Sequence, residues 1–157
     1  MPLLAAETAA AFVRSDLTAS ELQAVIDREE LRLVRRLGPH GDGVTPITIT
    51  VVGYGGDLFL SRPVVSVASV GGATSGWTLY AAQGRIGGGS WGGSVAVVGV
   101  PEDDRADRTA ALIDLVRLAV QRTALMTESV AGEYSYSAPD WEAARAAIYR
   151  RLLPSGS

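Results

Sequence analysis

The segment TESVAGEYSYS, residues 127–137, holds two carboxylates, two tyrosines and three serines within eleven residues. Glu128 and Glu133 could act as a general acid and base, or the whole segment could dock a partner protein. Acid–base catalysis needs surroundings that shift the pKa of one carboxylate, and the sequence places no apolar arrangement around these two. Tyrosine contributes strongly to protein interfaces. The composition therefore favours partner contact through Tyr134 and Tyr136 over catalysis.

The other candidates for catalysis or metal binding are weaker still. His40 is the only histidine and lies in the turn-like stretch GPHGDG, so a Ser-His-Asp site would have to use it. No serine lies in a GxSxG motif, and no cysteine is present to bind a metal as thiolate. PEDDRAD (101–107) could bind a divalent cation, but acidic residues before a helix more often cap it. We therefore expect no enzyme, no metal site and no cofactor.

Two further stretches could bind phosphate. GRIGGGSWGG (84–93) is glycine-rich, but it lacks the lysine of a P-loop and leads into a strand rather than a helix. A hairpin connection is the better interpretation, with Trp91 either packed on the sheet or against a partner. The Arg35–Arg36 pair could form a phosphate or partner patch, although a solvated helix end explains it more simply.

Length and charge restrict the protein classes that remain. At 157 residues the chain suits a single domain. The net charge of −3 and the absence of a basic stripe argue against direct recognition of nucleic acid. No run of eighteen apolar residues is present, and the N-terminal segment lacks the positive start of a signal peptide. We expect a soluble, intracellular protein without a membrane partner.

Helical patterns lie at both ends of the chain. A short apolar segment spans residues 7–14, and a clear amphipathic helix begins at a Thr18–Glu21 capping box and ends at Gly38-Pro39. Residues 104–126 show the same period. A last helix is predicted over residues 139–152, with Ser137 and Asp140 in capping positions and Trp141, Ile148 and Leu152 on one face.

The middle of the chain reads as β-structure. Four β-branched or apolar runs, at residues 47–52, 64–70, 77–81 and 94–100, predict four short antiparallel strands. Glycine-rich stretches at 53–56, 71–76 and 87–93 predict breaks between them. The sequence therefore indicates an α+β fold, in which a helical body of three to four helices carries an inserted small antiparallel β-subdomain. The helical parts cover 7–38 and 102–137, the insertion 44–100, and a C-terminal arm 138–157.

The order of these elements resembles the head-to-tail connector (adaptor) proteins of long-tailed phages and gene transfer agents. Four features carry the resemblance: the early helix DLTASELQAVIDREELRLVRRLG, the strand entry LFLSRPVVSVASV (58–70), the long helix followed by TESVAGEYSYS, and the closing amphipathic helix. Together they span roughly residues 8–152.

The resemblance implies a structural virion protein, assembled in the host cytoplasm and located in the neck. Twelve copies would form a ring between the portal and a stopper or tail protein, and DNA would pass through the channel without specific binding. The C-terminal arm would dock on the portal and the β-subdomain would contact neighbouring copies or the next ring, through Trp77 and Trp91. The portal-contact residues would be Tyr134, Tyr136, Trp141, Ile148, Tyr149 and Leu152.

Two alternatives stay open at this point. The glycine-rich β region could enclose an apolar pocket in a small oligomeric ligand-binding module. A sibling neck protein, the stopper, is also possible and would be mostly β-barrel.

Overall fold

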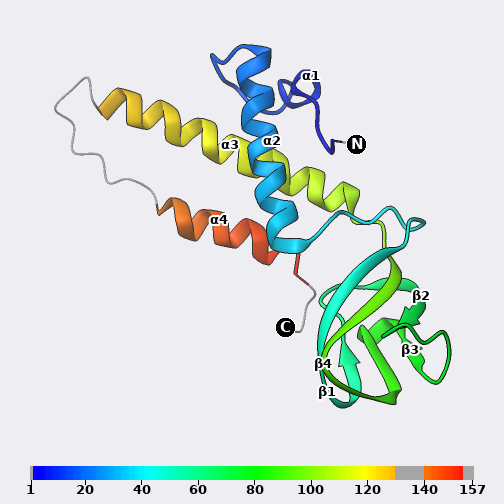
Figure 1. Ribbon diagram of the computed structural model, residues 1–157. Coiled ribbons are helices and arrows are strands. Elements are labelled where there is room, and N and C mark those ends of the chain that lie inside the picture. Colours follow the sequence, from blue (N-terminus) through cyan, green and yellow to red (C-terminus); the bar gives the residue numbers. More distant parts are fainter. Residues whose placement is uncertain (1, 130–139, 154–157) are drawn as a thin grey trace. The chain divides into compact units, whose positions relative to one another are not determined.

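The computed structural model of the protein describes residues 2–129 and 140–153, with the backbone alone for residues 125–129. This part of the chain contains four α-helices and a four-stranded antiparallel sheet, which confirms the predicted α+β class. It divides into two compact units (Figure 1). The helical unit consists of the residues up to Pro39 together with Arg105–Leu153, and the β unit consists of His40–Asp104. No described helix is long and apolar enough to cross a membrane.

The N-terminal helices begin and end where local signals place them. Helix α1 covers only Ala6–Ala9, so the predicted segment 7–14 is one helical turn followed by looser turns. Helix α2 spans Ala19–Leu37 and starts at the predicted capping box: the Thr18 hydroxyl accepts from the Glu21 N–H, and Glu21 accepts from the Thr18 N–H. At the other end Gly38 takes a positive φ of 75°, which glycine adopts without strain.

Replacing Thr18 with alanine is expected to destabilise the helical unit by about 1 kcal/mol at neutral pH, the usual cost of losing such a cap. The side-chain and backbone hydrogen bonds from Thr18 also lower the pKa of Glu21. A lowered folded-state pKa contributes stability above the ordinary glutamate value, about 4.3, and that contribution is lost as the pH falls further. Urea unfolding should therefore show a smaller Thr18→Ala effect at pH 3 than at pH 7. Ser20→Ala is the control, and an equal loss at both pH values would contradict the coupling.

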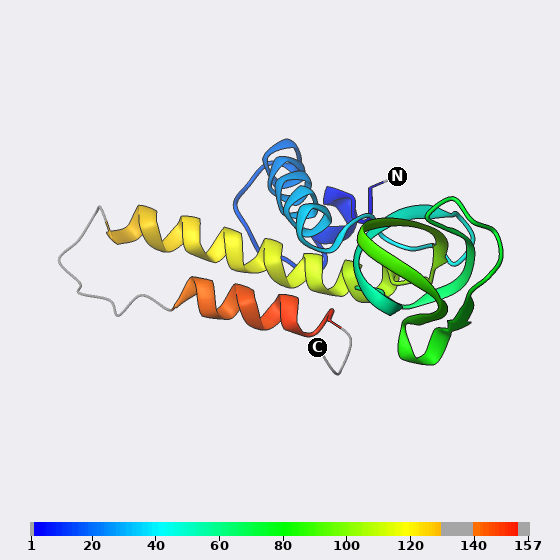
Figure 2. The ribbon, with the colours of Figure 1, turned by 60° about the horizontal axis from the view of Figure 1, so that its bottom comes forward.

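Helices α3 and α4 complete the helical unit. Helix α3 spans Arg105–Ser129 and α4 spans Trp141–Arg150. Figures 1 and 2 show α4 running back alongside α3, with α2 crossing them. Helix α4 is capped by Asp140, whose carboxylate accepts from the Ala143 N–H at 3.0 Å. The helix predicted to reach residue 152 ends at Arg150 in the structure. The predicted capping residue Ser137 lies outside the described residues.

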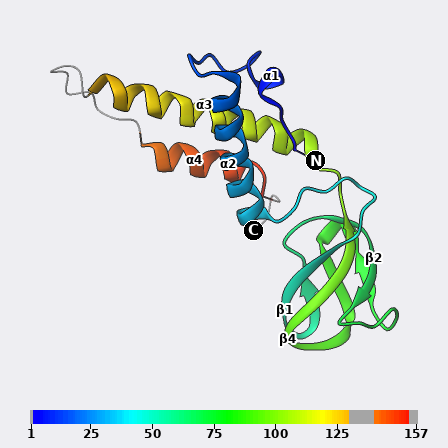
Figure 3. The ribbon, with the colours of Figure 1, turned by 45° about the horizontal axis from the view of Figure 1, so that its top comes forward.

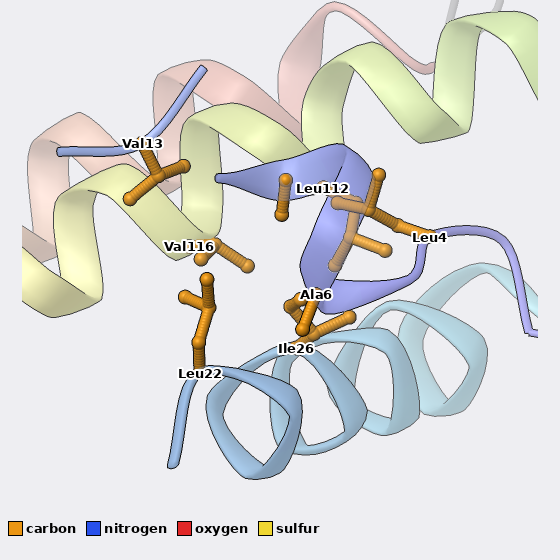
Figure 4. Packing of buried hydrophobic residues seen from close by; sticks show 8 residues of the cluster. Leu4, Ala6, Val13, Leu22, Ile26, Leu112 and Val116 are labelled. Atoms are coloured by element: carbon orange, nitrogen blue, oxygen red, sulfur yellow. The ribbon is translucent and has the colours of Figure 1, made fainter. Parts of the chain in front are cut away.

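Two apolar clusters hold these helices together. The first joins α1 and the segment around it to α2 and α3 (Figure 4), and its buried members are Leu4, Ala6, Ala9, Val13, Leu22, Ile26, Leu112 and Val116. The second joins α2, α3 and α4 through Leu33, Ala111, Leu115, Ile148 and Tyr149. The apolar stripe of α2 is therefore divided between two sets of partners.

The β unit is built around one long central strand. Strand β4 (Arg85–Pro101) pairs with β1 (Ile47–Phe59) on one side, and with β2 (Val64–Val70) and the short β3 (Thr78–Tyr80) on the other. All these pairings are antiparallel. Figure 3 shows β1 and β4 coiling side by side over most of their length. The predicted number of strands is therefore right.

The predicted breaks at 53–56 and 87–93 are wrong, because both glycine stretches lie inside strands. Gly53 pairs with Gly93, and a register shift between Gly55 and Asp57 lets the ladder continue to Phe59. The hairpin connection expected over 84–93 is likewise mostly strand β4. A Cβ atom at Gly53 would lie 2.9 Å from both the Leu58 Cδ2 and the Trp91 Cβ atoms. Glycine is needed here for close packing in a bent sheet rather than for a turn.

Apolar side chains fill the interior of the β unit. Ile86 lies at its centre, since it is fully buried and pairs across the ladder with both Leu58 and Leu79. The buried cluster consists of Leu58, Val70, Ile86, Val95 and Val97, with Trp77 and Trp91 packed against it. Within the described residues, these side chains fill the centre of the β unit.

Candidate functional site

The predicted contact residues of the last helix are buried or half-buried within the helical unit. Ile148 and Tyr149 are 8% and 4% exposed, and they pack against Leu33 and Leu115. Leu152 is half-buried against the same cluster, and Trp141 is half-buried at the start of α4. In the folded chain Ile148 and Tyr149 are core residues, so partner contact through them would require α4 to leave the helical unit. Tyr134 and Tyr136 lie outside the described residues, as does Glu133.

The two tryptophans predicted as contacts of the β-subdomain also face the interior. Both are half-buried and pack against the β cluster, and the Trp77 Nε1–H donates to the Ala73 carbonyl at 3.3 Å. Their burial is accounted for by this packing. The exposed aromatic side chains of the β unit are instead Tyr54, Phe59 and Tyr80, which the sequence pattern did not indicate.

The acidic stretch before α3 has a structural role within the β unit. Asp104 accepts from the Gly41 N–H at 2.7 Å and forms an ion pair with Arg62 at 2.8 Å. Nearby, hydrogen bonds from the Thr45 hydroxyl and from the backbone N–H groups of Thr45 and Val44 hold the pKa of Asp42 far below its usual range. Among the described residues no three His, Cys, Asp or Glu side chains are grouped so as to hold a metal ion.

A cleft lined by five arginines is the most distinctive polar feature of the helical unit. Its volume is about 430 Å³, and α2, α3 and α4 all contribute to it. The lining residues are Arg32, Arg35, Arg36, Arg122, Glu142, Arg145 and Tyr149. We call this the arginine cleft. Of its members, only Arg35 and Arg36 stand next to each other in the sequence as a candidate charged patch.

Glu29 organises two of these arginines from beneath the cleft. Its side chain is fully buried, and its two oxygens accept from Arg145 at 2.6 Å and from Arg32 at 2.8 Å. Burial by itself acts to lower the pKa of Arg145, but the hydrogen bond and negative charge of Glu29, aided by Tyr149, raise it. The guanidinium of Arg145 is therefore held in place and stays charged.

Tyr149 orients a third arginine. The guanidinium carbon of Arg36 lies 4.6 Å from the centroid of the Tyr149 ring, a cation–π arrangement that favours a fixed position. Arg35 and Arg122 are exposed, and within the described part of the chain they take part in no ion pair. The cleft thus combines arginines that are anchored with arginines that are available.

Spacing alone could have identified only one side of this cleft. Arg32, Arg35 and Arg36 follow the i, i+3, i+4 rule on one face of α2, so a search for basic helix faces would have found them. Arg122 and Arg145 come from other helices, and Glu29 lies 116 residues from Arg145. Arg122 and Arg145 join the site only through tertiary packing, as does the pairing of Glu29 with Arg145.

Exposed apolar side chains form a second notable surface, on the outside of the β unit. Tyr54 is 89% exposed and Phe59 66%, both on β1. Tyr80 is also exposed, and Arg85 lies over its ring at 4.1 Å while pairing with Asp57. Of the exposed large apolar side chains in the described residues, most lie in this unit: Val44, Val52, Tyr54, Phe59, Val65 and Tyr80.

Compared with known proteins, the chain matches no protein-family model, and it shows no significant similarity to any curated protein sequence.

Proposed function

We propose that this protein is a head-to-tail adaptor of a phage-type particle, a structural protein that forms a ring between the portal and the next neck or tail protein. The four ordered sequence features support it, together with an α+β chain whose β unit is inserted between two helices. The observation that carries most weight is the exposed apolar surface of the β unit. Exposed apolar side chains that gather on one part of a protein mark contact surfaces, and six of the nine exposed large apolar side chains of the described residues lie on this unit.

The β unit is therefore the part of the folded chain that we assign to contacts with neighbouring copies or with the next ring. Its interior is filled by its own apolar cluster, so Val52, Tyr54 and Phe59 are not required for that core. Aromatic residues at such positions bury large areas at interfaces at low entropic cost. The portal-docking role stays with the C-terminal arm, on the exposed residues of α4 rather than on Ile148 and Tyr149.

The stopper alternative receives less support from the fold. A stopper was expected to be mostly β-barrel, whereas about 41% of this chain is helical and 30% is in strands. An adaptor with a helical body is the better match to that balance.

Electron microscopy tests the proposal directly. The purified chain, mixed with the portal protein of the same particle, is expected to form a closed ring seated on the portal. A chain that stays monomeric in the mixture would overturn the adaptor assignment.

Ring formation is expected to depend on the outer surface of the β unit. The double variant Tyr54→Ser/Phe59→Ser should reduce the ring fraction at least tenfold by mass photometry, because truncating an aromatic residue that dominates an interface costs about 2 kcal/mol or more. Leu31→Ser, which removes a 50% exposed apolar side chain from α2, is the matched control. Rings that form equally well in both variants would exclude this surface from the interface.

A further inference from the structure

We infer that the arginine cleft is a binding site for a small polyanion that carries two or more phosphate groups. This inference concerns the helical unit and does not depend on the proposed ring function. It rests on the number of guanidinium groups that converge there, on the way they are held, and on the size of the cleft.

The charge within the cleft is strongly unbalanced. Five arginines line it, and the only carboxylates described in it or directly behind it are Glu142 and Glu29. Three positive charges remain in excess, although the whole chain has a net charge of −3. On α2 the spacings Arg32–Arg35 and Arg32–Arg36 bring like charges to neighbouring positions, which destabilises a helix. A bound polyanion would relieve this repulsion.

The arginines are arranged in a way that suits oxyanions. Arg145 and Arg32 are held by the buried Glu29, and Arg36 lies over the Tyr149 ring, so these groups lose little freedom when a ligand binds. Arg35 and Arg122 approach from two different helices and have no ion-pair partner among the described residues. Guanidinium groups donate paired hydrogen bonds to phosphate oxygens, and a chain of phosphates can meet several of them at once.

Size and surroundings favour a small ligand over nucleic acid. A volume of about 430 Å³ lies within the range of small-molecule sites, about 300–1,000 Å³. The positive charge is local, because the helical unit as a whole carries as many carboxylates as arginines. A compact anion in the cleft interacts mainly with the charges within a Debye length, about 8–10 Å. A long polyanion would also meet the acidic remainder of the surface.

Thermal unfolding with inorganic tripolyphosphate, at constant ionic strength, tests this site on the full chain. The melting temperature should rise with ligand concentration and follow a saturable one-site curve, reaching a shift of ~5–10 °C at a hundredfold excess over Kd. The variant Arg35→Gln/Arg122→Gln should bind at least tenfold more weakly, since each lost guanidinium removes charge-assisted hydrogen bonds. Without ligand this variant should melt at or above the wild-type temperature, which a purely structural role for these arginines would not produce.

The matched control is Arg14→Gln/Arg150→Gln, which removes two exposed arginines of the helical unit outside the cleft and should leave binding unchanged. If a nucleoside triphosphate binds with the same affinity as tripolyphosphate, the cleft recognises the phosphate chain alone. If it binds more tightly, the cleft also contacts the nucleoside. Equal responses of both double variants, or no saturable response, would overturn the inference. The inference would also be overturned if a single-stranded oligonucleotide or an octaglutamate peptide raised the melting temperature and tripolyphosphate did not.

Discussion

Replacing Glu29 with glutamine is expected to lower the stability of the helical unit by about 3–5 kcal/mol, the usual cost of removing one partner from a buried ion pair. Glu29 is fully buried and the side chain of Arg145 is only 16% exposed, so the variant leaves a largely desolvated guanidinium without its counter-charge. The second arginine, Arg32, is half exposed and contributes little to this loss. For a chain of this length the melting temperature should fall by roughly 6–20 °C, measured by circular dichroism at 222 nm.

Removing both charges should restore most of that stability. In Glu29→Met/Arg145→Met the two side chains are replaced by apolar ones of similar volume, an exchange that is often neutral or stabilising for buried ion pairs. Glu7→Gln removes an exposed carboxylate of α1 and serves as the control. If Glu29→Gln has the same melting temperature as the wild type, or if the double variant is no more stable than Glu29→Gln, the Glu29–Arg145 pair does not anchor α4.

Replacing Ile86 with alanine is expected to cost the β unit about 2–5 kcal/mol, because deletion of a fully buried aliphatic side chain leaves a cavity. The effect should lie at the upper end of that range, since Ile86 meets β1 on one side and β3 on the other and no single neighbour can fill the space. Trp77 and Trp91 pack against the same cluster. Urea unfolding followed by tryptophan fluorescence therefore reports the loss directly.

Val65→Ala is the matched control for this variant. Val65 is an aliphatic residue of β2 in the same unit, but it is 56% exposed, so its truncation should change the unfolding midpoint little. Equal shifts for Ile86→Ala and Val65→Ala would show that the apolar cluster is not the main source of stability in the β unit.

The ends of α2 and the whole of β2 follow from signals that act within a few residues. The Thr18–Glu21 capping box and Gly38 satisfy backbone groups of their own helix, so neighbouring residues alone decide where α2 starts and stops. Strand β2 has the predicted bounds, 64–70, because its β-branched run is bracketed by Pro63 and by two glycines. The α+β class could be predicted for the same reason.

The long strands could not be predicted in this way. Glycine runs at 53–56 and 87–93 carry the local signature of turns, yet in the structure they let β1 and β4 bend and approach each other. The contacts that demand glycine at position 53 come partly from Trp91, 38 residues further along the chain. The local sequence shows that the backbone at a glycine can adopt many conformations. Whether the glycine forms a turn or bends a strand depends on the strand that pairs with it.

The sequence by itself determined the fold class, the start and end of α2 and the bounds of β2, because hydrogen bonding and apolar period act over short distances along the chain. Tertiary structure alone decided that Ile148 and Tyr149 belong to the core, although their apolar character also suits a partner surface. It also decided that Glu29 lies beneath an arginine cleft shared by three helices. Which side chains are buried, and which charges lie close together, depends on the packing of segments that are distant in the sequence. The spacing of residues within one segment does not predict that packing.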